Sequence, residues 1–328
     1  MKGKHTIRIS DNRVRYEFTI KRNITIIRGD SATGKTTMLE MLDNYVRLGY
    51  ESGIHVECDV PVDTYMTDNR RSDWKTRLET MEGSIVFIEE MNTFIKTREF
   101  AEYVSKSDSY YVLVSRWDLK NLPYSVEEIY KLTEKGKYPK AKQVYNSLEK
   151  YYTFHVNPEI EDISKVITED SGSGYEYFDL YCQQNHLFCE SADGNSNMIK
   201  RMRNAQEGML CIADGAAFGG YIDECMHYLK YAGKDCIVWF PESFEYLILQ
   251  SGIVKIPDLE NILSDSSEYI DSKEFVNWER FFTNLLVEYT KGTELAYNKS
   301  ELNDYYKGDS SKNRIERGIP EEVLRLLK

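Results

Sequence analysis

Short apolar runs recur along the first third of the chain, and each ends in polar or glycine-rich residues. Residues 24–27 form a β-branched run typical of a buried strand, and residues 37–42 carry apolar side chains at helical spacing. Alternating apolar positions in residues 5–20 predict a β-hairpin before that strand. Residues 85–88 and 110–114 are continuous apolar runs, which suit the central strands of a parallel sheet. The pattern predicts an α/β fold.

The polar stretch between the first of these strands and its helix is a phosphate-binding motif. Gly29, four intervening residues and then Gly34, Lys35 and Thr36 complete the pattern G-x-x-x-x-G-K-[ST]. Glycines let the backbone turn its N–H groups toward phosphate oxygens, and a helix N-terminus adds positive potential. We expect Lys35 to bridge the β- and γ-phosphates and the Thr36 hydroxyl to bind Mg²⁺. The predicted nucleotide-binding residues are Gly29, Asp30, Ser31, Ala32, Thr33, Gly34, Lys35, Thr36 and Thr37.

Two carboxylates follow the apolar run at residues 85–88. Because ligands bind at the carboxyl ends of parallel strands, Glu89 and Glu90 are predicted to lie near the phosphate-binding loop. This is the Walker B position of a P-loop ATPase, where Asp is more usual than Glu. Glu89 would then hold Mg²⁺, and Glu90 would orient and deprotonate the attacking water. The alternative is a helix N-terminus that carries acids because the helix dipole favours them.

The run at residues 110–114 ends in Ser115 and Arg116. In many P-loop ATPases the strand beside Walker B ends in a polar sensor of the γ-phosphate. Ser115 is the candidate sensor, and it completes a predicted catalytic set with Glu90 and Lys35. Arg116 is either a phosphate-contacting cation or the ion-pair partner of a nearby acid.

Composition indicates a division of the chain near residue 170. Residues 170–174 are rich in Ser and Gly, which is typical of a linker. This predicts a P-loop NTPase domain over residues 1–168 and a second α/β domain over residues 175–328, whose last part is helical. Its strand-like runs alternate with helical segments, which implies another parallel sheet. These runs are residues 186–190, 209–213 and 236–240.

Acids stand at the ends of the strand-like runs in the second half. Glu190 and Asp214 are therefore predicted to converge at one sheet edge as carboxylate ligands of a hard metal ion. An ordinary α/β domain with acids at its strand ends is the alternative.

The second half also resembles a toprim domain, the fold shared by topoisomerases, primases and nucleases of the overcoming-lysogenization-defect (OLD) class. Glu190 matches the first toprim glutamate, and Asp214 matches the first acid of the D-x-D motif. Ser243 and Glu245 resemble the later serine–glutamate element. Ala216 occupies the position of the second D-x-D acid, a loss that should weaken a two-metal site.

The composition of the chain limits the kinds of binding partner that are expected. A chain of 328 residues with 41% hydrophobic and 29% charged residues is long enough for two globular domains. Its net charge of −12 disfavours a broad electrostatic surface for nucleic acid, but leaves a local basic groove open. The six cysteines show no C-x-x-C pairing, which predicts buried thiols in a reducing cytoplasm. No apolar run is long enough to span a bilayer, so no membrane partner is expected.

The predicted function is Mg²⁺-dependent ATP binding and hydrolysis coupled to a toprim-like effector or regulatory domain. The resemblance to OLD-class and related phage-defence proteins implies an effector that acts on nucleic acid, although no L-S-G-G-Q-like signature precedes Walker B. A second hypothesis is a P-loop kinase for a small molecule, with a lid formed by Arg70, Arg71 and Arg77. A third is a nucleotide switch or scaffold completed by a partner, such as a second copy that supplies Arg98 or Arg116.

Overall fold

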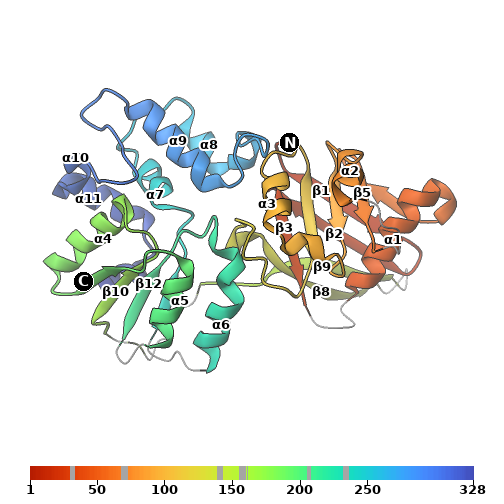
Figure 1. Cartoon of the computed structure of the whole chain (residues 1–328), viewed down its shortest axis with the longest axis horizontal. Coiled ribbons are helices and arrows are strands. Elements are labelled where there is room, and N and C mark those ends of the chain that lie inside the picture. The colour runs from red at the N-terminus through yellow and green to blue at the C-terminus, as the bar shows by residue number, and fades with distance from the viewer. Residues whose placement is uncertain are drawn as a thin grey trace. The chain divides into compact units, whose positions relative to one another are not determined.

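The computed structural model describes the chain except for residues 30–33, 68–72, 139–142, 155–159, 161, 205–207 and 232–235. It divides into two compact units (Figure 1). Unit 1 comprises Met1–Thr153 and Asp265–Asn277, and unit 2 comprises Phe154–Ser264 and Trp278–Lys328. The expected boundary near residue 170 is therefore too late, and the return of residues 265–277 to unit 1 was not predicted. The α/β prediction is confirmed, because each unit has a sheet with helices.

Unit 1 is built on a nine-stranded sheet in the order β4-β1-β2-β9-β8-β3-β7-β6-β5. The stretch from β8 to β5 is parallel, whereas β1 and β2 form the predicted antiparallel hairpin. The strand β5 and the β8–β9 hairpin were not predicted from the sequence. The strands are β1 (His5–Ser10), β2 (Val14–Ile20), β3 (Ile24–Arg28), β4 (His55–Glu57), β5 (Val62–Tyr65), β6 (Ile85–Ile88), β7 (Tyr110–Val114), β8 (Ile129–Tyr138) and β9 (Gln143–Lys150).

Helix α1 of unit 1 is fixed against the sheet by its apolar face. Met38 and Leu42, one helical turn apart, are fully buried in the same core cluster as Phe87 of β6 and Val112 of β7. The strands β3, β6 and β7 are buried along their whole length, as their continuous apolar sequences predict. This packing holds the start of α1 at the carboxyl end of β3. The helices of unit 1 are α1 (Lys35–Leu48), α2 (Trp74–Glu79) and α3 (Arg98–Val104).

Unit 2 contains a parallel four-stranded sheet in the order β11-β10-β12-β13. The predicted parallel sheet is confirmed, but its interior strand β10 was missed. The strands are β10 (Lys165–Thr168), β11 (Phe188–Ser191), β12 (Met209–Ile212) and β13 (Cys236–Trp239). The helices are α4 (Ser173–Gln184), α5 (Asn195–Arg203), α6 (Ile222–Tyr231), α7 (Phe244–Gln250), α8 (Leu259–Ser264), α9 (Trp278–Thr290), α10 (Asp304–Lys307), α11 (Asp309–Ile315) and α12 (Glu321–Leu327).

Residues 170–172 form a short connection between β10 and α4, and residues 173–174 begin α4, so this stretch is not the expected linker. A Cβ atom on Gly172 would lie 2.2 Å from the carbonyl oxygen of Lys299, and one on Gly174 would lie 3.3 Å from Cβ of Phe244. The glycines are therefore needed for close packing and not for chain flexibility. Composition alone cannot separate these two uses of glycine.

Two further expectations concern the whole chain. Within the described residues, no helix has both the length and the apolar character needed to cross a membrane. All six cysteines are free thiols, of which five are buried and Cys58 is half-buried. The prediction of buried thiols is thus confirmed for five of the six.

Candidate functional sites

The phosphate-binding motif spans the end of β3 and the start of α1, as the sequence predicts. Gly29 and Gly34 have φ angles of 138° and 88°, a region of backbone that favours glycine. The Tyr16 hydroxyl donates a hydrogen bond of 3.0 Å to the Gly34 carbonyl oxygen. Burial, aided by Asp11, raises the pKa of Tyr16 to about 12, so this hydroxyl remains a donor. The predicted ligands Asp30, Ser31, Ala32 and Thr33 lie outside the described residues.

Lys35 is the first residue of α1, and only 7% of it is exposed. Its Nζ atom donates a hydrogen bond of 2.7 Å to the carbonyl oxygen of Gly29, so the side chain reaches back toward the end of β3. Thr36 and Thr37 are exposed in the same turn of α1. The first N–H groups of a helix have no partner within the helix. Together with the ammonium group, they favour an anion at this point.

Adjacent parallel strands bring Ser115 to the same sheet edge as the loop. The strand β7 lies between β3 and β6, with Val114 opposite Ile27 and Leu113 opposite Ile88. The backbone N–H of Ser115 donates a hydrogen bond of 3.2 Å to the Ile27 carbonyl oxygen. Ser115 therefore stands directly beside the point where β3 leads into the loop.

Glu89 and Glu90 follow β6, the next strand along this edge. The Glu89 backbone N–H donates to the Tyr65 carbonyl oxygen at 3.2 Å, and Glu89 Oε2 accepts from the Thr67 N–H at 2.9 Å. Glu90 Oε2 lies 3.4 Å from Nε of Arg116, and both side chains are partly exposed. The structure thus shows Arg116 as an ion-pair partner of Glu90.

The alternative explanation for these two acids was a helix N-terminus. Residues 89–92 form a turn, and the short 3₁₀ helix that follows begins only at Thr93. Glu89 and Glu90 therefore end a strand rather than begin a helix.

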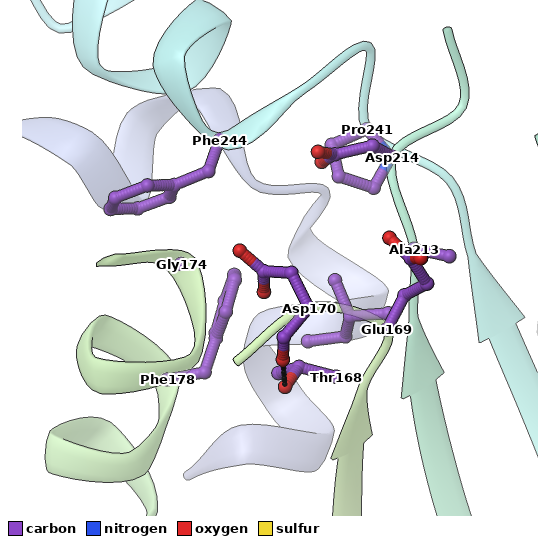
Figure 2. A pocket seen from close by; sticks show the side chains of 10 residues that line it. Thr168, Glu169, Asp170, Gly174, Phe178, Ala213, Asp214, Pro241 and Phe244 are labelled. Carbon is purple, nitrogen blue, oxygen red and sulfur yellow. Dashed lines mark hydrogen bonds between the residues drawn. The ribbon is translucent and has the colours of Figure 1, made fainter. Parts of the chain in front are cut away.

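In unit 2, a small pocket opens at the carboxyl ends of β10 and β12 (Figure 2). Its volume is about 20 Å³, which is enough for a water molecule or a single small ion. Figure 2 shows Glu169 and Asp170, which follow β10, and Asp214, which follows β12, bordering this hollow. Phe178 and Phe244 complete much of its apolar wall.

The acids of this pocket lie close enough together to raise one another's pKa. Burial, together with the charges of Asp170 and Glu279, raises the pKa of Glu169 to about 7. Burial is also the main reason that the pKa of Asp214 lies well above its ordinary value, and Glu279 and Glu245 add to the shift. The pKa of Asp170 is raised in the same way. The cluster thus disfavours full ionisation.

Glu245 extends this cluster from the first turn of α7, where it is only 1% exposed. Its Oε1 atom accepts a hydrogen bond of 2.8 Å from the Tyr297 hydroxyl, while Oε2 has no hydrogen-bond partner among the described residues. The Lys299 ammonium group contacts the Glu279 carboxylate and lies 4.0 Å from Oε1 of Glu245. Lys299, for which the sequence predicted no role, is therefore part of the acidic cluster.

Glu190, the metal ligand expected beside Asp214, is not among the residues that line this pocket. Its carboxylate lies 2.5 Å from Nζ of Lys165 and 2.6 Å from a guanidinium nitrogen of Arg201. Partial burial alone would raise the pKa of Glu190, but hydrogen bonds from these two cations bring it below its ordinary value. The acids that accompany Asp214 are instead Glu169 and Asp170.

Sequence reasoning missed Glu169 and Asp170 because residues 170–174 were interpreted as a linker. The signal that could have found them is the β-branched run at residues 166–168, directly before the two acids. That run is as strand-like as the others in unit 2, but it is only three residues long.

The described residues do not fit the two-metal site that the toprim resemblance implies. Among them, no group of three or more His, Cys, Asp or Glu side chains has an arrangement that could hold a metal ion. Ala216 places a buried methyl group where the second D-x-D acid would stand. The Lys299 ammonium group adds a positive charge next to the remaining acids.

Comparisons of the chain with protein-family models, with curated proteins and with solved structures find no match. The chemistry of the two sites is therefore inferred from their own residues.

Proposed function

We propose that unit 1 binds ATP with Mg²⁺ and hydrolyses it. The observation that supports this most directly is the strand order β3-β7-β6 in a parallel sheet. That order gathers the glycine–lysine loop, Ser115 and the two acids Glu89 and Glu90 at the edge where open α/β sheets bind ligands. A glycine-rich turn with a chance lysine would not require polar residues at the ends of the next two strands.

The residues of this edge then have distinct roles. Lys35 and the N–H groups of the first turn of α1 would hold the phosphates. Thr36 and Glu89 would hold Mg²⁺, which offsets phosphate charge when it is bound. Glu90 would accept a proton from the attacking water, and Ser115 would contact the γ-phosphate.

We propose that the protein is cytoplasmic. We also propose that unit 2 is a toprim-like domain, which acts as an effector or regulator under the control of the nucleotide bound to unit 1. Its parallel sheet, with acids after β10 and β12 and Glu245 after β13, supports this interpretation. In this proposal Glu169, rather than Glu190, corresponds to the first toprim glutamate, because it follows β10, the first strand of this sheet along the chain. Ala216 and Lys299 favour a regulatory role over a two-metal nuclease.

The other hypotheses have less support. For a kinase lid, Arg70 and Arg71 lie outside the described residues, and the guanidinium of Arg77 stacks 4.3 Å over the Tyr65 ring. For an arginine supplied by a second copy, Arg116 is paired with Glu90, whereas Arg98 is exposed at the start of α3. Arg98 is thus the better candidate of these two.

Phosphate release from Mg²⁺–ATP tests the proposal, measured with and without DNA. The wild type should release phosphate, and Glu90→Gln should bind ATP but hydrolyse it at least about 100-fold more slowly. Glu82→Gln, an exposed acid before β6, is the matched control and should behave as the wild type. A normal rate for Glu90→Gln would refute the catalytic role of the β6 acids, and DNA-stimulated release would support a nucleic-acid effector.

A further inference from the structure

Lys299 belongs to a short segment, residues 297–299, that is anchored to the turn carrying Asp170. The Ser173 N–H donates a hydrogen bond of 2.8 Å to the Lys299 carbonyl oxygen, and the Ser173 hydroxyl lies 2.5 Å from the Tyr297 hydroxyl. Gly172 packs on the same carbonyl oxygen so closely that a Cβ atom would lie 2.2 Å from it. The backbone from which Lys299 projects therefore has a fixed place.

Residues at both ends of this segment, Tyr297 and Lys299, interact with the Glu245 carboxylate. The Tyr297 hydroxyl donates to Oε1 of Glu245 at 2.8 Å, and Nζ of Lys299 lies 4.0 Å from the same oxygen while it contacts Glu279. The Lys299 side chain is 41% exposed, whereas the side chains of Glu245 and Glu279 are 2% and 16% exposed. The ammonium group thus reaches from a partly open position toward the buried Glu245 and the half-buried Glu279.

The charge of Lys299 is coupled to every acid of the pocket. Burial would lower the pKa of Lys299, but Glu245, Glu279 and Asp214 together raise it above its ordinary value. Conversely, the charge of Lys299 opposes the upward pKa shifts of Glu169, Asp170 and Asp214. One side chain therefore supplies the positive charge that a cluster of carboxylates at strand ends would otherwise take from a bound cation.

We propose that Lys299 is the resident cation of this cluster, and that unit 2 binds no divalent metal at Asp214 while Lys299 is in place. Lys299 does not line the pocket itself, but its ammonium group lies beside Glu245 and Glu279, the two acids whose charges also act on Asp214. A second positive centre at Asp214 would be repelled by it, because Coulomb energies are large where water is scarce. The lysine is tethered to the chain, so it is always present at the site, whereas a free metal ion must pay its own association entropy. Ala216 removes the additional carboxylate that would shift this competition toward a metal.

Without the Lys299 side chain, the acidic cluster should bind a divalent metal ion. The Oε2 atom of Glu245 is buried and has no hydrogen-bond partner among the described residues, so it is available to a cation. With the ammonium group gone, the side chains of Glu245 and the pocket acids, which do not form a metal-binding arrangement as they stand, would rotate toward a hard divalent ion. The inference concerns unit 2 alone and does not depend on nucleotide chemistry in unit 1.

Mn²⁺ binding to the full chain without nucleotide tests this, with free Mn²⁺ followed by electron paramagnetic resonance. Lys299→Met should gain a Mn²⁺ site at least about tenfold tighter than any Asp214-dependent site of the wild type. The double variant Lys299→Met/Asp214→Asn should lose that site. Lys291→Met, an exposed lysine in the same part of the chain, is the matched control and should bind Mn²⁺ as the wild type does.

Two results would overturn the proposal. One is wild-type Mn²⁺ binding that disappears in Asp214→Asn, and this comparison needs no lysine variant. The other is a folded Lys299→Met protein that gains no site. Should Lys299→Met fail to fold, Lys299→Gln provides the same test with a polar side chain. Mn²⁺ held in unit 1 is recognised because it is unaffected by Asp214→Asn.

Discussion

The Nζ atom of Lys35 donates a hydrogen bond of 2.7 Å to the carbonyl oxygen of Gly29, which links the start of α1 to the residue that follows β3. A neutral carbonyl is a weaker acceptor for an ammonium group than a phosphate oxygen, because the negative charge of the phosphate adds Coulombic attraction to the hydrogen bond. An arriving phosphate oxygen can therefore replace this contact. The relationship indicates that Lys35 is held close to the end of β3, where a phosphate is expected to bind, before a ligand arrives.

Lys35→Ala should abolish measurable ATP binding, a loss of at least about 100-fold in affinity, because a charged hydrogen bond and a positive charge are lost together. Titration with a fluorescent ATP analogue measures this loss. Lys106→Ala, an exposed lysine of unit 1, is the control and should bind ATP normally. Unchanged affinity in Lys35→Ala would mean that the loop does not hold the phosphates.

Gly172→Ala should destabilise unit 2 by about 2–3 kcal/mol, because the new Cβ atom would meet backbone that cannot rotate away. The contact is the carbonyl oxygen of Lys299 at 2.2 Å, so the segment that carries the lysine must also shift. Urea unfolding compares this variant with Gly308→Ala, whose Cβ atom would lie at an ordinary 3.5 Å from the nearest atom. Equal stability of the two variants would contradict the packing described for this turn.

The stability of unit 2 should fall as pH rises from about 4.5 to 7. The pKa of Glu169 is raised from 4.5 to about 7, so in this window the folded unit holds a proton that the unfolded chain has released. Unfolding then releases protons, and higher pH favours it, by at most about 3 kcal/mol for this group. Asp170 and Asp214 are shifted in the same direction.

The measurement that isolates Glu169 is the difference in unfolding free energy between wild type and Glu169→Gln at pH 5 and pH 8. The wild type should lose more stability than the variant over this range. Other acids, such as Glu190 with its lowered pKa, change stability mainly below pH 5, and they do so alike in both proteins, so they cancel in the difference. A wild type that gains stability relative to the variant would show that Glu169 is stabilised as a carboxylate.

The parts of this fold that were predictable from the sequence are those coded by local pattern. Continuous apolar runs placed β3, β6 and β7, and glycine spacing placed the loop, because strand burial and φ preferences depend on neighbouring residues in the chain. The strand order that puts Ser115 next to Ile27 follows from tertiary pairing, which a single sequence does not encode locally. Whether the nucleotide-binding prediction holds depends on the ATP experiments.

The pocket of unit 2 was less predictable for two physical reasons. The short strand β10 leads directly into a stretch rich in Ser and Gly. The glycines of that stretch serve close packing, but its composition suggested a linker. Lys299 approaches Glu245 only through folding of a segment that is distant in sequence, and nothing in the pattern around residue 299 indicates a contact with a buried acid. Glu190 ends a strand-like run just as Asp214 does, but Lys165 of β10 and Arg201 of α5 form ion pairs with it.

The last prediction concerns a buried ion pair in unit 1. Nε of Arg22 lies 3.5 Å from Oε1 of Glu128, and these side chains are 5% and 0% exposed. Burial raises the pKa of Glu128, while Arg22, Lys150 and Lys21 oppose that rise. Arg22→Met should destabilise unit 1 by about 3–5 kcal/mol, because it leaves a buried carboxylate without its nearest buried cation.

The double variant Arg22→Met/Glu128→Leu should recover most of this loss, because it removes the uncompensated charge as well. The Tyr130 hydroxyl, which donates to Oε2 of Glu128 at 3.2 Å, loses its acceptor in the double variant, so recovery should be incomplete. Urea unfolding of the wild type, both single variants and the double variant completes the cycle. Additive effects of the two single variants would show that the pair contributes no coupling energy, and that Lys21 and Lys150 already balance Glu128.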